Sequence, residues 1–98
     1  MATRTTDIGT LITRTAEIRG GRPRIAGTGV TVQRIVGWAK LGLTPEEIVA
    51  EIGHVTLAQV HAALAYYHAN PQAIESAIAA DQAEAERLAA QHPSTAGA

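Results

Sequence analysis

Two helix-start signals lie close together in residues 43–67 and constrain the fold of this chain more than any other feature. Residues 44–47 (TPEE) form a capping box, in which a threonine hydroxyl and a glutamate side chain bind backbone N–H groups at a helix start, and residues 56–59 (TLAQ) repeat it. Gly53 is placed to end the first helix, because glycine adopts the left-handed conformation without strain. A short helix, a turn of about four residues and a longer helix indicate a helix-turn-helix.

Apolar residues at helical spacing support this interpretation and predict a core. Leu57, Val60, Leu64 and Tyr67 recur along the longer helix. We therefore predict a mainly helical fold: a three-helix core containing the helix-turn-helix, a short N-terminal β-hairpin or arm, and an additional C-terminal helix. The predicted core residues are Ile25, Val30, Val32, Ile35, Val36, Leu41, Leu43, Ile48, Val49, Ile52, Val55, Leu57, Val60, Leu64 and Tyr67.

The segment before the helix-turn-helix has strand character. Residues 11–18 and 24–32 are rich in β-branched side chains and flank a glycine-containing turn, which predicts a hairpin or an arm that pairs across a dimer. Thr31 can cap a first helix over residues 32–41. Gly37 inside that helix is unfavourable, and we expect another backbone to approach it closely.

The chain is expected to form one domain with tails. Residues 1–9 are polar and predicted to be flexible, residues 10–70 hold the hairpin and core, residues 71–91 form an alanine-rich acidic helix, and residues 92–98 are predicted to be disordered. With 98 residues and no cysteine, the chain has no disulfide or thiolate chemistry. We find no signal peptide or membrane-spanning run, so we expect a cytoplasmic protein without a membrane partner.

The charges are divided between the two parts of the chain. Residues 1–40 carry seven basic and two acidic residues, a net charge of +5, whereas residues 41–98 carry one basic and seven acidic residues, a net charge of −6. The basic part could meet nucleic acid and the acidic part a basic protein. Alternatively, the two parts attract each other in a homodimer.

Three motifs in a fixed order resemble a known bacterial family. Residues 21–29 (GRPRIAGTG), residues 44–48 (TPEEI) and the helix of residues 57–67 are similar to the domain of unknown function 433 family, whose members include VapB-like antitoxins. The resemblance implies a homeodomain-like core, a homodimer and a role as antitoxin to a PIN-type ribonuclease-like toxin. Such antitoxins usually bind their own promoter as well. Gly29 is a departure, because the family usually has arginine there.

Six residues are candidates for DNA contacts. Basic side chains suit phosphates, and polar side chains at the start of a second helix suit base edges. The candidates are Arg22, Arg24, Arg34, Lys40, Thr56 and Gln59. Residues 19–24 (RGGRPR) also resemble an AT-hook, but we favour a glycine turn with solvated arginines as the explanation of this segment. No lysine or arginine lies in residues 45–67, and three glutamates there oppose DNA binding by the helix-turn-helix itself.

The acidic C-terminal helix is the candidate surface for a protein partner. Its apolar stripe is narrow, so the helix would be weak alone. We expect apolar anchors and carboxylates to meet a toxin with a basic surface. The candidates are Ile74, Glu75, Ile78, Asp81, Glu84 and Leu88. A stand-alone DNA-binding regulator and a non-catalytic dimeric scaffold are the alternatives.

The sequence gives little support for catalysis. The glycine-rich segments lack the ending of a phosphate-binding loop, and no serine has a base beside it in a motif. His61 and His68 share a helix face but are about 10.5 Å apart along its axis, too far to share one zinc ion within one copy. A symmetric dimer could still build a zinc site, but we favour the interpretation as surface histidines. We therefore expect no catalytic residue, metal, cofactor or small-molecule substrate.

Overall fold

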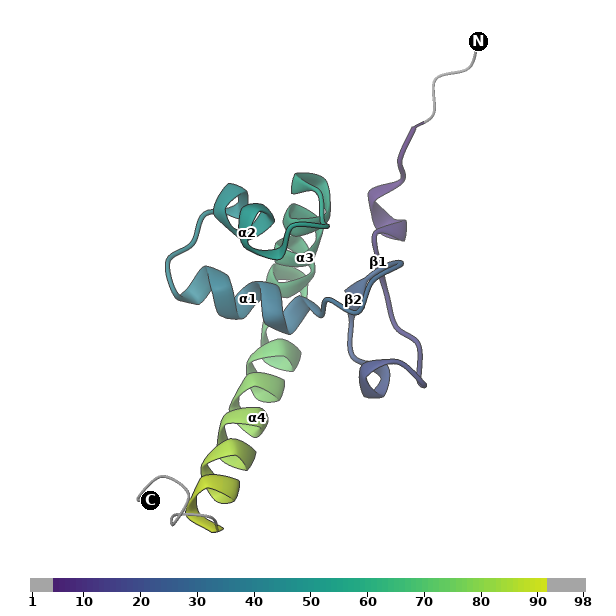
Figure 1. Ribbon diagram of the computed structural model, residues 1–98. Coiled ribbons are helices and arrows are strands. Elements are labelled where there is room, and N and C mark those ends of the chain that lie inside the picture. Colours follow the sequence, from purple (N-terminus) through teal and green to yellow (C-terminus); the bar gives the residue numbers. More distant parts are fainter. Residues whose placement is uncertain (1–4, 92–98) are drawn as a thin grey trace.

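The computed structural model describes residues 5–91, and it is mainly helical with a small N-terminal sheet, as predicted. The predicted disordered tail and the first four residues of the predicted flexible segment lie outside the described residues. Figure 1 shows the shorter helices gathered together and the long C-terminal helix leading away from them. The elements are β1 (Ile12–Thr13), β2 (Arg24–Ile25), α1 (Val32–Lys40), α2 (Pro45–Ile52), α3 (Leu57–Ala69) and α4 (Pro71–Gln91), with single 3-10 turns at Ile8–Thr10 and Arg19–Gly21.

Both predicted capping boxes are present at the starts of α2 and α3. The Thr44 hydroxyl accepts a hydrogen bond from the Glu47 backbone at 3.2 Å, and the Glu47 carboxylate accepts one from the Thr44 backbone at 2.8 Å. Thr56 and Gln59 make the equivalent pair at 3.2 and 2.7 Å. Gly53 ends α2 with φ at 88°, the left-handed conformation expected for it. The axes of α2 and α3 meet at 118°, as in a helix-turn-helix.

The core lies where α1, α2, α3 and the start of α4 meet. Its ten buried apolar residues are Ile25, Val30, Val32, Ile35, Val36, Ile48, Val55, Val60, Ala63 and Ile74. Two predicted core residues are wrong, because Leu41 is 76% exposed and Leu57 is 40% exposed. Leu41 is the C-cap of α1 and Leu57 is the first residue of α3, so both lie at helix ends beyond the buried face.

The hairpin is shorter than the predicted strands. Ile12 pairs with Ile25 and Thr13 with Arg24 in an antiparallel register, and only two residues of each strand take part. The chain between them turns through Arg19–Gly21, where all three residues have positive φ, so a continuous pair of strands cannot form. Ile25 is fully buried and fixes the hairpin to the helices.

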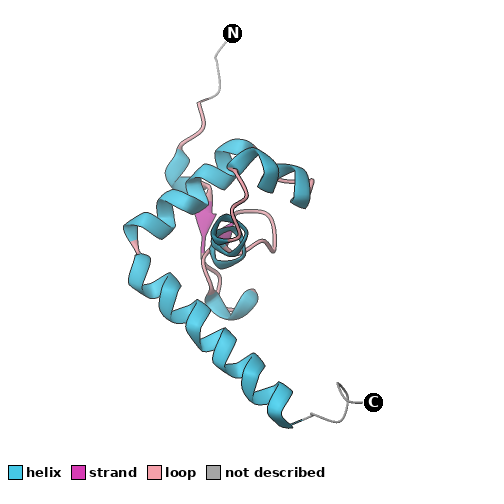
Figure 2. Ribbon diagram, turned by 90° about the vertical axis from the view of Figure 1, so that its left-hand side faces the viewer, coloured by secondary structure: helices cyan, strands magenta, loops and turns pink. Residues whose placement is uncertain are grey.

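α4 has two parts with different surroundings. Figure 2 shows that α4 meets α3 at a sharp angle and then runs past the other helices. In the proximal half, residues 71–81, Ile74 is buried and Ile78 packs against the core. In the distal half, residues 82–91, every residue is exposed. The distal half is therefore a free helical extension of the fold.

Candidate functional site

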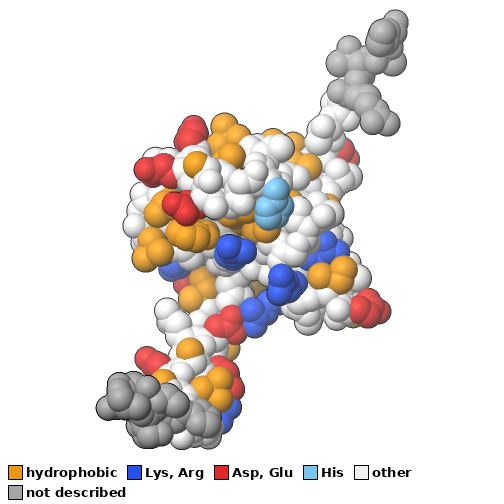
Figure 3. Space-filling model, viewed as in Figure 1, with side chains coloured by type: hydrophobic (Ala, Val, Ile, Leu, Met, Phe, Trp, Pro, Cys, Tyr) orange, Lys and Arg blue, Asp and Glu red, His pale blue; other side chains and the backbone are white. Residues whose placement is uncertain are grey.

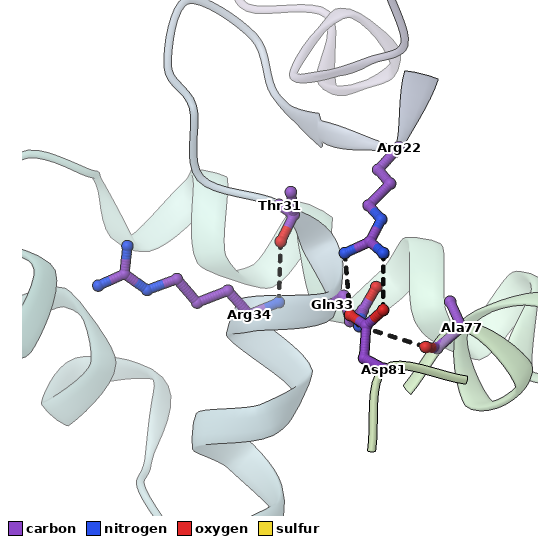
Figure 4. A network of polar contacts seen from close by, with 6 residues as sticks. All are labelled: Arg22, Thr31, Gln33, Arg34, Ala77 and Asp81. Atoms are coloured by element: carbon purple, nitrogen blue, oxygen red, sulfur yellow. Dashed lines mark hydrogen bonds and ion pairs between the residues drawn. The ribbon is translucent and has the colours of Figure 1, made fainter. Parts of the chain in front are cut away.

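Arg22 and Asp81 join the hairpin region to α4 through a bidentate ion pair (Figure 4). Arg22 donates from Nη1 and Nη2 to the two carboxylate oxygens at 2.9 and 2.7 Å. Gln33 of α1 donates from Nε2 to Asp81 at 2.5 Å. The Arg22 guanidinium first, and the Gln33 amide second, lower the pKa of Asp81. The pair positions one face of the proximal half of α4 against the core.

A second network joins α1, α3 and α4. Lys40 Nζ lies 2.8 Å from Glu75 Oε2, and the Tyr67 hydroxyl donates a hydrogen bond to the same oxygen. The hydrogen bond from Lys40, followed by that from Tyr67, lowers the pKa of Glu75. In return, the Glu75 carboxylate raises the pKa of both Lys40 and Tyr67.

The two networks show that the basic and acidic parts of the chain attract each other within one molecule. Arg22 and Lys40 were predicted to contact DNA, and Glu75 and Asp81 were predicted to contact a partner protein, yet each cation pairs with one of these carboxylates. All four side chains remain close to half exposed. Solvent screens such pairs, so they position α4 without locking it.

Arg24 is buried inside the hairpin and is not exposed as a phosphate contact requires. The residue is 7% exposed, its Nη1 donates to the Thr28 carbonyl at 2.8 Å, and its Nη2 donates to the Thr15 hydroxyl at 3.0 Å. Its Nε has no hydrogen-bond partner among the described residues. Arg24 is thus directed at the backbone of its own turn, and it stabilises the hairpin rather than reaching the surface.

Of the other predicted DNA contacts, only Arg34 has an uncommitted charged group. Thr56 and Gln59 use their side chains in the capping box at the start of α3. Arg34 is exposed, and Figure 4 shows its side chain extending away from Asp81. Among residues 5–91 it has no carboxylate partner. In Figure 3, Lys and Arg side chains cross the middle of one face, whereas acidic side chains gather over α2.

The predicted partner-binding residues divide between the two halves of α4. Ile74 and Ile78 pack against the core, and Glu75 and Asp81 are in ion pairs with it. The distal half holds the remaining two candidates. Glu84 pairs with Arg87 within the helix, and Leu88 is 45% exposed.

Comparison with known protein families identifies the family of this chain. Residues 12–67, more than half of the chain, match the family described as "Protein of unknown function (DUF433)". The chain belongs to the DUF433 family. It is similar to the crystal structure of a DUF433 member protein from Anabaena variabilis, with 31% sequence identity, a TM-score of 0.67, and coverage of 71% of this chain and 69% of that chain. No curated protein matches the sequence.

The match to DUF433 begins at β1 and ends within α3, before α4. The family description gives no function, so the VapB-like antitoxin role stays a prediction. Gly29, the departure from the family motif, lies under the guanidinium of Arg19. A Cβ atom there would be 2.9 Å from Arg19 Nη2, and Arg19 Nε donates to the Gly29 carbonyl at 3.1 Å. An arginine from the preceding turn thus occupies the space beside this position.

Sequence reasoning missed two polar side chains that take part in the ion-pair networks. Gln33 was not singled out, and Tyr67 was assigned to the core without a role for its hydroxyl. Tyrosine could have been recognised, because a partly buried tyrosine hydroxyl usually has a hydrogen-bond partner. Among the described residues, no group of three or more metal-ligating side chains is close enough to bind an ion. No single described helix is long and apolar enough to cross a membrane.

Proposed function

We propose that this chain is a non-catalytic, antitoxin-like protein that binds a small ribonuclease-like toxin through the distal half of α4. The observation that carries the proposal is the exposure of every residue from 82 to 91 in a continuous helix. A helix of this length has little stability of its own in water, so a surface that covers it would gain an ordered binding element. We expect this complex to form in the cytoplasm.

The side chains of the distal half fit a basic partner surface with an apolar groove. Leu88 is a large exposed side chain, and alanines around it allow a close approach to another protein. Glu84 and Glu86 add negative charge to a helix that has Arg87 as its only cation after residue 81 within the described part. Carboxylates on a helix accelerate association with a basic surface and select against acidic partners.

The same observations favour a protein partner over DNA. Arg22 and Lys40 already pair with carboxylates, Arg24 is buried, and the capping side chains of α3 are engaged. The acidic surface of α2 would repel the phosphate backbone beside the helix-turn-helix. Any binding to the chain's own promoter would therefore depend on Arg34 and the remaining hairpin arginines.

The test must remove the distal half without removing the core. Deletion from residue 71 would also remove buried Ile74, so the informative variant is a chain that ends at Gln82. We would capture proteins from the native host with tagged full-length chain, with the 1–82 chain and with Leu88→Asp, and identify them by mass spectrometry. Glu46→Gln, which changes an exposed acid on α2, serves as the matched control.

The expected result is a small ribonuclease-like protein, retained in stoichiometric amount by the full-length chain and by the control variant. Its ribonuclease activity should fall when full-length chain is added and should be unaffected by the 1–82 chain and by Leu88→Asp. Equal retention by the full-length and 1–82 chains would contradict the proposal, because the distal half would then be unnecessary.

A further inference from the structure

An open groove runs between α1 and α4 on the side of Arg34. Its volume is about 460 Å³. Gly37 and Trp38 line it from α1, Ile78 and Gln82 line it from α4, and Arg34 and Lys40 contribute basic side chains. The groove thus combines an apolar interior with positive charge.

Gly37 has no explanation within a single copy of the chain. Glycine inside a helix is less stable than alanine, and its φ here is not positive, so the backbone does not require it. A Cβ atom at Gly37 would have no other atom within 4 Å, apart from its own helix backbone and chain neighbours. Internal packing therefore does not require a small residue either. What the absent side chain provides is space in the groove for another backbone.

The apolar stripe of α4 continues past the part of the core that covers it. Ile74, Ile78, Ala85 and Leu88 lie at positions of a repeat with alternating intervals of four and three residues, the spacing of a coiled-coil seam. Asp81 occupies the position between Ile78 and Ala85 and is the charged residue of the repeat, in an ion pair with the hairpin region. The seam begins on the core, where Ile74 and Ile78 are covered, and its last two members are exposed. Helices with this repeat normally pack against a second helix along its full length.

We propose that the distal half of α4 from a second copy occupies this groove, and that the contact is reciprocal. Ile78 and Gln82 line the groove and also mark the point where α4 leaves the core. A two-fold axis near Gln82 would pair the two α4 helices antiparallel and place each distal half over the groove of the other copy. Because the groove ends where the exposed distal half begins, two copies can fill each other's grooves, and this favours a second copy over an unrelated helical partner.

The side chains on both sides are complementary in this arrangement. Leu88 of one copy meets the exposed Leu41 and the half-buried Trp38 of the other, and the backbone of α4 approaches at Gly37. Glu84, which flanks the seam and also pairs with Arg87 of its own helix, meets Arg34, whose guanidinium has no carboxylate partner among residues 5–91. The inference does not depend on the proposed toxin. Because both complexes use the distal half of α4, a toxin and a second copy exclude each other.

The test is the oligomeric state of charge-reversal variants, measured by sedimentation equilibrium without any other protein. Arg34→Glu and Glu84→Arg each place like charges at both symmetric contacts, so each alone should weaken the dimer by at least about tenfold. In an equimolar mixture, one copy of each variant restores two opposite-charge contacts, so a heterodimer should form. Glu46→Arg on α2 is the matched control and should leave dimerisation unchanged.

Gly37→Leu tests the groove without relying on charge. Leucine favours helix and meets no atom of the same copy near its Cβ, so the fold should be retained, as circular dichroism would show. The side chain fills the groove, and the dimer should dissociate. A wild-type chain that is monomeric at all accessible concentrations would overturn the inference. So would a dimer unaffected by Gly37→Leu, or a variant mixture that remains monomeric, and none of these results bears on toxin binding.

Discussion

The two halves of α4 have similar alanine-rich sequences but different physical roles. The proximal half is held by buried Ile74 and by two carboxylates that pair with cations of the core. The distal half continues the same helix with every residue exposed. Once the first turns are fixed, each further helical residue adds a hydrogen bond at little entropic cost, so the distal half extends as helix without contacts of its own. The two halves of α4 therefore differ in their contacts with the core and not in their composition.

Because of this difference, we expect the stability of the fold and the binding of partners to depend on different residues of α4. Full burial of an isoleucine side chain contributes about 1.5–3 kcal/mol, and Ile74 is only 3% exposed. The distal half contributes no buried residue to the core of one copy, so its residues can change without disturbing the core. We therefore expect stability to depend on residues 71–81 and association to depend on residues 82–91.

The largest effect should come from truncation at two points along α4. A chain that ends at Asn70 loses Ile74 and both ion pairs, and its free energy of unfolding should fall by several kcal/mol or the chain should not fold. A chain that ends at Gln82 should stay within about 0.5 kcal/mol of the full-length chain. Urea unfolding at low protein concentration measures both. Equal losses would show that the distal half also supports the core.

A matched pair of alanine substitutions gives the next largest effect. Ile74→Ala removes a buried side chain and leaves a cavity, so the free energy of unfolding should fall by about 2–5 kcal/mol. Leu88→Ala acts on a side chain that is 45% exposed and should cost no more than about 0.5 kcal/mol. Guanidinium unfolding of the two variants compares them directly. A large loss for Leu88→Ala would contradict the division of roles.

Local signals in the sequence predicted much of the fold. Both capping boxes and the stop at Gly53 depend on neighbouring residues, and the structure contains all three. Helical periodicity identified the faces that contain Ile35, Ile48 and Val60. Periodicity does not show where a helix ends relative to the core, which is why the prediction that Leu41 is buried was wrong. It also does not show what covers a stripe, so Ile74 was assigned to an interface instead of the core.

The candidate site was less predictable because it depends on contacts between distant residues. The division of charge was compatible with external partners and with attraction between the two parts, and it could not show that Arg22 pairs with Asp81 of the same copy across 59 residues. Arg24 was expected at the surface because arginine is rarely buried. Its burial follows from a turn that brings the Thr28 carbonyl, four residues along the chain, to its guanidinium. This contact is local, but the residue pattern does not show how the turn closes.

Acid should loosen the proximal half by protonating its two paired carboxylates. The pKa values of Asp81 and Glu75 are lowered from 3.8 and 4.5 in the folded chain, mainly by Arg22 and Lys40. Their contribution to stability is therefore fully present above the ordinary values and is lost as the pH falls through the lowered ones. The urea midpoint should decrease between about pH 5 and pH 2. Asp81→Asn combined with Glu75→Gln should flatten this decrease, and an unchanged slope would contradict the assignment.

The smallest expected effect is a change in the pKa of Glu75, which distinguishes the contributions of the two side chains that donate to it. Lys40 is the main cause of the lowered pKa of Glu75, and the Tyr67 hydroxyl is the second. Tyr67→Phe removes only the hydroxyl, so the pKa of Glu75 should rise but stay below its ordinary value. Lys40→Gln should raise it further, because it removes the main donor and its charge. The carboxyl carbon chemical shift of Glu75, followed by NMR during an acid titration, measures both changes. If Tyr67→Phe produced the larger change, the hydroxyl rather than the ion pair would position Glu75, and the proximal half would be held to α3 more than to α1.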